Sequence, residues 1–467
     1  MLTLDLQVFQ NPYLPSGGSE INAIISVTAG STQSAHVTDE MMEVFLLDCS
    51  ASMTDPPSKL AAVREATSRA IDRLRDGTWF AVVAGRRTAR IVYPPPRWEG
   101  TGAEPLTVAA SDKTRQEARD AVAKLYAEGG TAISTWLSEA RHLFAARPDA
   151  IHHALLLTDG RNESEDPALL QTELQQCLGK FECDCRGVGT HWDRAELQGI
   201  ADALLGSTDI ISHPSQMGAE FEAIIERRMS KQVRSVLLQV LTPVGGRIRF
   251  LKQVAPEVVD LTQMASWMQP SGVDGEWRTE LRPDPGRPLV THYPTGSWSF
   301  GEQRDYHICL EVVPQEVGEA NEVRAARVSL VGEGAAPTQA PVRAIWTDDA
   351  DRATRIHQGV AHYSGQAELA GVIEEGLRAR QVGDVDTATA RLGRAVQLAA
   401  ASGNEGTRRL LEAVVEVEDA ERGTVRLRTK VTKEDEMTLD TRSRRTVRLP
   451  RSRNVPSPAN GEGQGGG

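Results

Sequence analysis

The stretch VFLLDCSASMTD, residues 44–55, changes character halfway along its length. Residues 44–47 are apolar and predict the interior of a buried strand. Asp48, Ser50 and Ser52 then follow at every second position and supply one carboxylate and two hydroxyls. Ligands bind outside the carboxyl ends of the strands in open parallel sheets. The stretch therefore predicts a binding site at the end of this strand.

The surrounding residues predict a regular alternation of strands and helices. Strand-like runs such as TWFAVVAG (78–85) and IHHALLLTDG (151–160) alternate with helical runs such as TAISTWLSEARHLF (131–144). This alternation is typical of a mostly parallel sheet with helices on both faces. We therefore expect a doubly wound α/β domain over residues 41–229.

The rest of the chain predicts further domains. Residues 1–40 and 230–347 alternate with the period of two that is typical of strands. We expect these two segments to form one β-sandwich-like domain into which the α/β domain is inserted. Residues 351–420 predict a helical region, in which two helices around Gly383 need a neighbour to bury their apolar faces. Residues 421–467 are basic and then low in complexity, so we expect a largely disordered tail.

Two more oxygen-bearing side chains belong at the same edge of the α/β sheet. Asp159 ends the strand-like run LLLTDG, and Thr131 follows a glycine break that opens a helix. Together with Asp48, Ser50 and Ser52 they form a set of hard oxygen ligands without histidine or thiolate. Such a set suits Mg²⁺, with Mn²⁺ as a substitute.

The sequence DCSAS (48–52) matches the D-x-S-x-S motif of the von Willebrand factor A (VWA) family. Thr131 and Asp159 fall where the metal-ion-dependent adhesion site (MIDAS) of that family continues, and the order of elements over residues 41–229 is similar. The resemblance implies that the two serines and Thr131 bind the ion directly, while Asp48 and Asp159 act mainly through water. It also implies that an acidic residue of a protein partner completes the site. Segments outside this domain resemble bacterial, chiefly actinobacterial, cytoplasmic proteins that carry it.

Other interpretations of the same residues stay open. Ser50 and Ser52 could cap the next helix, and Asp159 could begin a turn. The protein could also be a metal-dependent phosphohydrolase, a subunit of an enzyme complex, or a scaffold whose metal site is vestigial. The motifs of nucleotide-binding loops, serine hydrolases and zinc proteases are missing from the sequence. Ser50 stands where a haloacid-dehalogenase phosphatase needs its second aspartate, so we expect a binding protein and no enzyme.

Composition limits the partners and the compartment. The 467 residues carry a formal net charge of −12, which argues against nucleic-acid binding. No apolar run is long enough to insert into a membrane, and the start MLTLDLQVFQ lacks the basic region of a secretory signal. Five cysteines do not form a disulfide framework. We therefore expect a cytoplasmic protein, in which Cys183 and Cys185 are two buried thiols or, alternatively, a metal or redox pair.

The basic segment TRSRRTVR, residues 441–448, supports a separate hypothesis. Its arginines precede candidate phosphorylation sites at Thr441, Ser443 and Thr446. A phosphothreonine at 446 with Leu449 three residues later resembles a ligand of forkhead-associated (FHA) domains, so the tail could dock a phosphothreonine reader. The alternative is a solvated basic tail without a partner.

Overall fold

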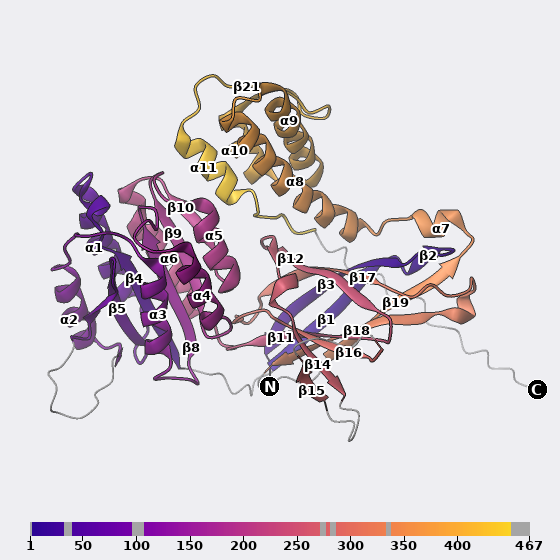
Figure 1. Ribbon diagram of the computed structural model, residues 1–467, viewed down its shortest axis with the longest axis horizontal. Coiled ribbons are helices and arrows are strands. Elements are labelled where there is room, and N and C mark those ends of the chain that lie inside the picture. Colours follow the sequence, from indigo (N-terminus) through magenta and orange to yellow (C-terminus); the bar gives the residue numbers. More distant parts are fainter. Residues whose placement is uncertain are drawn as a thin grey trace, which may run out of the picture.

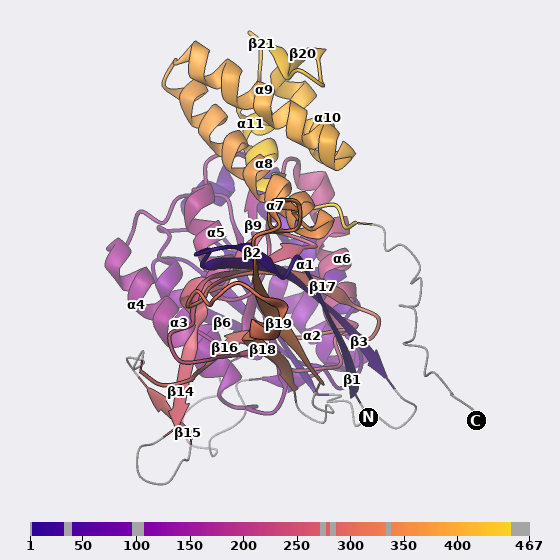
Figure 2. The ribbon, with the colours of Figure 1, turned by 90° about the vertical axis from the view of Figure 1, so that its right-hand side faces the viewer.

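The computed structural model describes residues 2–31, 40–95, 107–270, 277–280, 286–332 and 338–449. They form three parts, which we call the α/β unit (41–229), the β unit (2–31 with 230–347) and the helical unit (350–449). The α/β and β units lie side by side, and the helical unit lies over both (Figures 1 and 2). No described helix is both long and apolar enough to cross a bilayer.

The α/β unit is built on a seven-stranded sheet in the order β10-β9-β8-β4-β5-β6, with β7 also paired to β5. Five strands are parallel, and only β6 and β7 are antiparallel to β5. The strands are β4 (Met41–Asp48), β5 (Trp79–Gly85), β6 (Arg90–Tyr93), β7 (Val108–Ala109), β8 (Ile151–Thr158), β9 (Glu182–Val188) and β10 (Thr208–Ile211).

Helices cover both faces of this sheet, as the sequence predicts. One face packs against α1 (Ser58–Asp72), α2 (Asp112–Val122) and α6 (Met217–Met229). The other packs against α3 (Ile133–Phe144), α4 (Pro167–Cys177) and α5 (Arg194–Ala203). All eight residues of β4 are buried for this reason, which explains why residues 44–47 are apolar without alternation.

The register of the parallel strands decides where the predicted site residues lie. Leu47 of β4 is level with Leu157 of β8, and Asp48 is level with Gly85 of β5. The segments that follow β4 and β8 therefore leave the sheet at the same edge and at neighbouring positions.

The β unit consists of two sheets around one core. The first has the order β1-β3-β17-β12-β13 and the second β15-β14-β16-β11-β18-β19-β2. Their strands are β1 (Leu2–Gln10), β2 (Tyr13–Pro15), β3 (Glu20–Ser31), β11 (Val236–Thr242), β12 (Arg247–Ala255), β13 (Val259–Asp260), β14 (Ser266–Pro270), β15 (Trp277–Glu280), β16 (Leu289–Pro294), β17 (Gln303–Glu311), β18 (Val323–Gly332) and β19 (Thr338–Thr347).

Strands that precede the α/β unit in the sequence pair within these sheets with strands that follow it. β3 precedes the α/β unit and lies antiparallel to β17, which follows it, with Glu20 opposite Glu311 and Thr28 opposite Gln303. β2 also precedes the α/β unit and pairs with β19, which follows it, but these two strands are parallel. Trp298, Tyr306 and Trp346 are the largest side chains of the common core, and each is fully buried.

The helical unit contains α7 (Ala350–Thr354), α8 (Gln358–Gln381), α9 (Val385–Ser402), α10 (Glu405–Val414), the hairpin β20 (Val415–Asp419) and β21 (Thr424–Leu427), and α11 (Lys433–Arg442). Gly383 has a φ of +80° and turns the chain between α8 and α9, where Asp384 caps α9 by accepting a hydrogen bond from the Thr387 amide. The apolar faces of this helix pair are buried against α10, the hairpin and Leu439 of α11.

The expectation of a disordered tail from residue 421 is wrong for the described part of it. Residues 424–427 form β21, and residues 433–449, which we call the C-terminal strap, begin with α11 and then cross the surfaces of the other two units. Arg442 and Arg445 bind Asp209 of β10, and Arg448 binds Asp305 of β17. The segment lacks apolar periodicity because ion pairs with distant residues hold it in place. The predicted glycine-rich end, residues 450–467, lies outside the described residues.

Candidate metal centre

Asp48 is the innermost of the predicted site residues. It ends β4 and is fully buried. Its Oδ1 accepts a hydrogen bond of 2.8 Å from the amide of Ser50, and its Oδ2 accepts one of 2.6 Å from the hydroxyl of Thr158. Burial raises the pKa of the Asp48 carboxyl to about 6, against the hydrogen bonds from Ser50 and Thr158, which lower it. Because burial disfavours the ionised carboxylate of Asp48, a cation bound next to it would stabilise that ionised form.

The other four predicted residues come together around Asp48. The hydroxyl oxygens of Ser50 and Ser52 are 2.9 Å apart, and Ser52 Oγ donates a hydrogen bond of 2.5 Å to Asp159 Oδ1. A methyl group placed on Gly160 would lie 3.2 Å from Ser52 Oγ and 4.0 Å from Thr131 Oγ1. Glycine at this position therefore leaves space beside both hydroxyls. Ser52 is exposed, whereas Ser50, Thr131 and Asp159 are buried, so the cluster opens to solvent on one side.

Backbone contacts hold the three loops of the cluster together. The amide of Ala51 donates to Gly129 O, and the amide of Glu128 donates to Cys49 O. The amide of Ser164 donates to Thr131 O in the same way. These bonds connect the loops after β4 and β8 to the loop that carries Thr131, so the oxygen-bearing side chains are held in place before any ligand arrives.

Two residues of the cluster are not evident from the sequence. Thr158 directly precedes Asp159, and its hydroxyl faces Asp48 instead of the apolar core. Lys59, in the first turn of α1, places its Nζ 2.7 Å from Asp159 Oδ2, and its side chain is only 13% exposed. Strand alternation beside an aspartate could have identified Thr158, whereas no local signal marks Lys59.

The residues around the cluster divide into two groups. Asn162 has a positioning role, because its Oδ1 accepts a hydrogen bond from the Ile133 amide at the start of α3 and its Nδ2 donates to Glu165. Asp55, Arg161 and Glu163 are exposed. These three are therefore available to a docked partner.

The donor set fits a hard divalent cation. It consists of two carboxylates and three hydroxyls, which are the oxygen ligands that Mg²⁺ and Mn²⁺ accept. Among the residues that the structure describes, no group of three or more His, Cys, Asp and Glu side chains could hold a metal. Cys183 and Cys185 are buried free thiols with sulfur atoms 3.9 Å apart. The oxygen donors of the five predicted residues thus fit a hard divalent cation.

A buried histidine between two acids could suggest catalysis, but its contacts indicate a structural role. His153 Nδ1 lies 2.8 Å from Glu43 Oε2, and its Nε2 lies 3.2 Å from Asp184 Oδ2. Arg228 of α6 binds Asp184 as well. Burial alone would lower the pKa of His153, but the charge of Glu43 and the hydrogen bond to Asp184 raise it. All of these groups are buried, so the cluster balances charge between the strands of the sheet and α6.

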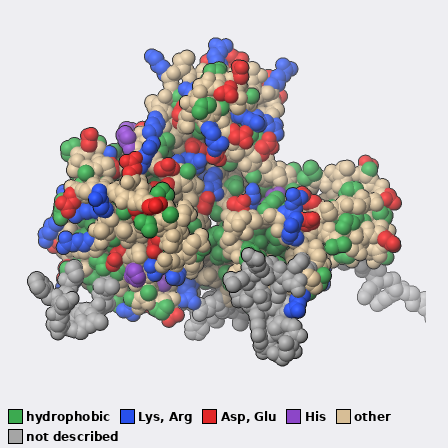
Figure 3. Space-filling view, viewed as in Figure 1, with side chains coloured by type: hydrophobic (Ala, Val, Ile, Leu, Met, Phe, Trp, Pro, Cys, Tyr) green, Lys and Arg blue, Asp and Glu red, His purple; other side chains and the backbone are tan. Residues whose placement is uncertain are grey.

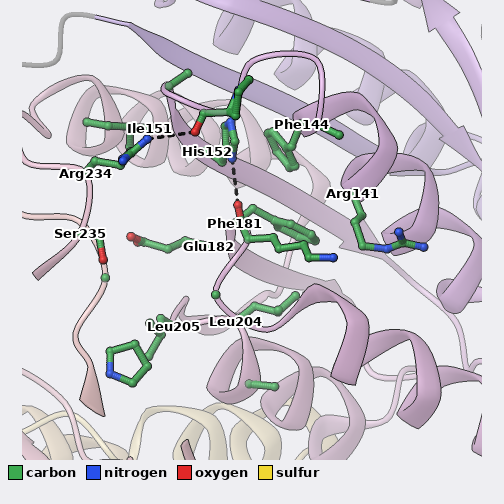
Figure 4. A pocket seen from close by; sticks show the side chains of 18 of the residues that line it. Arg141, Phe144, Ile151, His152, Phe181, Glu182, Leu204, Leu205, Arg234 and Ser235 are labelled. Carbon is green, nitrogen blue, oxygen red and sulfur yellow. Dashed lines mark hydrogen bonds between the residues drawn. The ribbon is translucent and has the colours of Figure 1, made fainter. Parts of the chain in front are cut away.

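A cavity of about 520 Å³ lies where the opposite edge of the α/β sheet meets the β unit (Figure 4). Phe144, Phe181 and Leu204 supply apolar walls. His152 Nδ1 lies 2.9 Å from Lys180 O, a contact that a dashed line marks in Figure 4. Its Nε2 lies 2.7 Å from Arg147 O. Glu182 is paired with Arg228 of α6. His152 and Glu182 are therefore engaged in contacts within the fold.

Two of the three candidate phosphorylation sites of the tail are buried, and the third, Thr446, is half-buried. Thr441 and Ser443 are 1% and 4% exposed, and Thr446 donates a hydrogen bond of 2.7 Å to Val254 O of β12. A kinase or an FHA-type reader needs an accessible, extended segment. The expectation of a free, basic docking tail over residues 441–448 is therefore wrong, because the strap is packed against the other units.

Family models match two parts of the chain. Residues 44–210 match the von Willebrand factor type A domain, and residues 397–443 match the von Willebrand factor type A C-terminal domain. The second match includes α11, so it reaches into the region that we expected to be disordered. It begins inside the predicted helical region.

Three proteins illustrate the similarity. The solved structure of a von Willebrand factor type A protein from Catenulispora acidiphila is 42% identical, with a TM-score of 0.83 over 96% of this chain and 97% of that chain. The ArnB paralog VWA2 from Sulfolobus acidocaldarius is 12% identical with a TM-score of 0.51, over 95% of this chain and 98% of that chain, and shares the fold alone. The uncharacterized protein sll0103 from Synechocystis sp. is 30% identical over 224 residues, which are 46% of this chain and 49% of that protein. The chain thus spans about half the length of this curated relative.

The site geometry, the two domain matches and the similarity along almost the whole chain agree with one another. The chain belongs to the bacterial proteins that contain a von Willebrand factor type A domain.

Proposed function

We propose that this protein is a metal-ion-dependent protein-binding module. It binds an acidic residue of a partner through Mg²⁺, and Mn²⁺ can replace Mg²⁺. The observation that supports this most is the convergence of Asp48, Ser50, Ser52, Thr131 and Asp159 at one edge of the sheet, where Ser52 is open to solvent. VWA domains commonly mediate metal-dependent protein interactions, which fits the same conclusion.

The five residues would have different tasks. Ser50, Ser52 and Thr131 would offer neutral hydroxyl oxygens to the ion, and the buried carboxylates of Asp48 and Asp159 would balance its charge. The bound ion would supply a positive position that a partner's carboxylate can reach from the open side. The hydroxyl of Thr158 and the amide of Ser50 keep Asp48 oriented for this task.

The β and helical units would serve as a scaffold for the assembly. In this proposal residues 1–40 complete the β domain, so that the α/β domain is an insertion, as the pairing of β3 with β17 suggests. The five free, buried cysteines support a cytoplasmic location. A nucleic-acid partner is disfavoured by the net charge of −12, and Figure 3 shows acidic and basic side chains interspersed over one face.

The alternatives are a metal-dependent phosphohydrolase, an enzyme-complex subunit and a scaffold with a vestigial metal site. A phosphohydrolase needs a nucleophile and a general acid at the metal. Ser50 stands where a haloacid-dehalogenase phosphatase needs its second aspartate, and its hydroxyl is within hydrogen-bond distance of Ser52. This arrangement favours binding over turnover.

The test combines ion binding with capture of a partner. Calorimetry with MgCl₂ should detect one site in the full chain, and Asp159→Asn should abolish it. Asp120→Asn, which removes an exposed carboxylate from α2, is the matched control and should bind as the original protein does. A pull-down from the native host should recover a partner that EDTA releases, and p-nitrophenyl phosphate should not be hydrolysed. Unchanged Mg²⁺ binding in Asp159→Asn would contradict the proposal, and hydrolysis lost in this variant alone would favour the phosphohydrolase.

A further inference from the structure

Among the residues that the structure describes, Lys59 is the one cation that lies directly on a predicted ion-binding carboxylate. Its Nζ is 2.7 Å from Asp159 Oδ2, while Asp159 Oδ1 accepts the hydrogen bond from Ser52. The side chain of Asp159 is fully enclosed and that of Lys59 is 13% exposed, so solvent screens this ion pair only weakly. Both oxygens of Asp159 are therefore engaged, one by a neutral donor and one by a full positive charge.

The position of Lys59 follows from the local fold. It is the second residue of α1, which begins after a short 3-10 helix (Ala51–Thr54) and two prolines. The first turn of α1 follows directly on the loop that carries Ser50 and Ser52, and the lysine reaches from it to the end of β8. Arg86, another cation near the cluster, binds Glu128 and the carbonyl oxygen of Tyr126 at the rim. Lys59 thus contacts a predicted ion-binding residue directly, whereas Arg86 contacts residues at the rim of the cluster.

The charges of the cluster have a direct consequence for an ion. Asp48 and Asp159, when ionised, would neutralise a divalent cation completely. With the ammonium of Lys59 in the same cluster, a loaded site keeps one net positive charge. A monovalent carboxylate cancels that charge, so it is attracted to the loaded site and adds to the affinity for the ion.

We propose, resting on the metal-dependent binding described above, that Lys59 is a specificity-determining residue that weakens binding of the ion alone and couples it to binding of an anionic partner. Lys59 does this by two effects. It repels the incoming cation, and it competes for Asp159 Oδ2. Because coupling between two ligands is reciprocal, an acidic ligand strengthens ion binding by the factor by which the ion strengthens binding of the ligand.

The experiment uses the full chain and Mn²⁺, whose free concentration is measured by electron paramagnetic resonance. Lys59→Met removes the charge and keeps an apolar chain of similar length. It should bind Mn²⁺ roughly tenfold more tightly than the original protein, as expected for removing one like charge at close range. Lys59→Arg keeps the charge and should stay within a few-fold of the original affinity. Lys113→Met removes an 84% exposed lysine from the first turn of α2 and should change nothing.

The second arm measures the coupling with acetate as the carboxylate probe. Potassium acetate replaces potassium chloride at equal ionic strength, with a correction for Mn²⁺ that acetate binds in solution. Acetate should tighten Mn²⁺ binding in the original protein and should do so much less in Lys59→Met. Both measurements are repeated with Lys59→Gln, which carries a polar neutral side chain. This variant replaces Lys59→Met if circular dichroism shows that the methionine variant is poorly folded.

The outcomes separate the two proposals. If the original protein binds neither Mn²⁺ nor Mg²⁺, the metal-dependent function itself fails. If it binds the ion but the neutral variants at position 59 bind it equally or more weakly, Lys59 is a structural partner of Asp159 and this inference is overturned. Equal acetate effects in the original protein and in the neutral variants would overturn the coupling in the same way.

Discussion

Arg445 Nη2 lies 2.6 Å from Asp209 Oδ2, although the two residues are 236 positions apart in the sequence. Arg442 Nε binds the other oxygen of the same carboxylate at 2.8 Å. Asp209 is on β10, the last parallel strand of the α/β sheet, and its side chain is 6% exposed. One buried aspartate therefore anchors the C-terminal strap to the α/β unit through two arginines.

Replacement of Asp209 should loosen the strap. Burial opposes ionisation of Asp209, but the hydrogen bond from Arg442 and the charge of Arg445 lower the pKa of its carboxyl below the usual value. Asp209→Asn should reduce the free energy of unfolding by about 2 kcal/mol at pH 7, less than for a fully buried pair because both arginines are partly exposed. Hydrogen exchange of α11 should increase in this variant.

The effect should depend on pH with a definite sign. A depressed pKa means that the stabilisation is complete above the usual carboxyl pKa of about 4 and disappears as the pH falls through the lower value of the folded state. The difference in melting temperature between Asp209→Asn and the original protein should therefore shrink between pH 5 and pH 2. A difference that stays constant over this range would show that the charge of Asp209 is irrelevant.

Gly160→Ala should weaken ion binding with little effect on the fold. The added methyl group would lie 3.2 Å from Ser52 Oγ, so the serine has to move away from its position beside Asp159. We expect roughly a tenfold loss of Mg²⁺ affinity and a melting temperature within about 2 °C of the original, because Ser52 is exposed and can rotate. Gly199→Ala is the control, since a methyl group there meets no atom within 4 Å. Equal Mg²⁺ affinity in both variants would exclude Ser52 as a ligand.

Thr158→Val should make ion binding more sensitive to acid. The valine keeps the shape of the side chain but removes the hydrogen bond to Asp48 Oδ2. Burial raises the pKa of Asp48 to about 6, and this hydrogen bond is one of the contacts that lower it. Protons compete with the ion at Asp48 below that pH, so Mn²⁺ affinity of the original protein should fall below about pH 6. In Thr158→Val the fall should begin at higher pH, as titrations of bound Mn²⁺ between pH 5 and pH 8 can measure. Identical profiles would show that Thr158 does not control the ionisation of Asp48.

Removal of residues 1–40 should damage the β unit and spare the α/β unit. β17 would lose its partner β3, whose backbone groups pair with it from Glu20 to Thr28. We expect a chain that starts at Met41 to melt at lower temperature and to self-associate in size-exclusion chromatography. The isolated segment 41–229 should fold alone, because its two cores come almost entirely from its own residues. A monomeric truncated chain as heat-stable as the full chain would refute the discontinuous domain.

The sequence could predict the α/β unit and the positions of its polar residues for a simple reason. Parallel strands that are covered on both faces are mostly apolar, so the polar residues at the ends of β4 and β8 are easily recognised in the sequence. The topology of the sheet then brings these residues to one edge. Lys59 could not be predicted, because its contact with Asp159 depends on how α1 begins. The strap could not be predicted either, since Asp209 and Asp305 lie far from its arginines in the sequence and leave no local pattern.

The contact between α11 and β10 also affects the order in which the protein is made. β10 is the outermost strand on its side of the α/β sheet, and α11 packs beside it (Figure 1). Domains fold as they leave the ribosome, N-terminal parts first, so the α/β unit is complete long before residues 433–442 are synthesised. During that interval β10 has no cover from α11, and Asp209 lacks its contacts with Arg442 and Arg445. Synthesis of α11 is therefore the step that covers this side of β10.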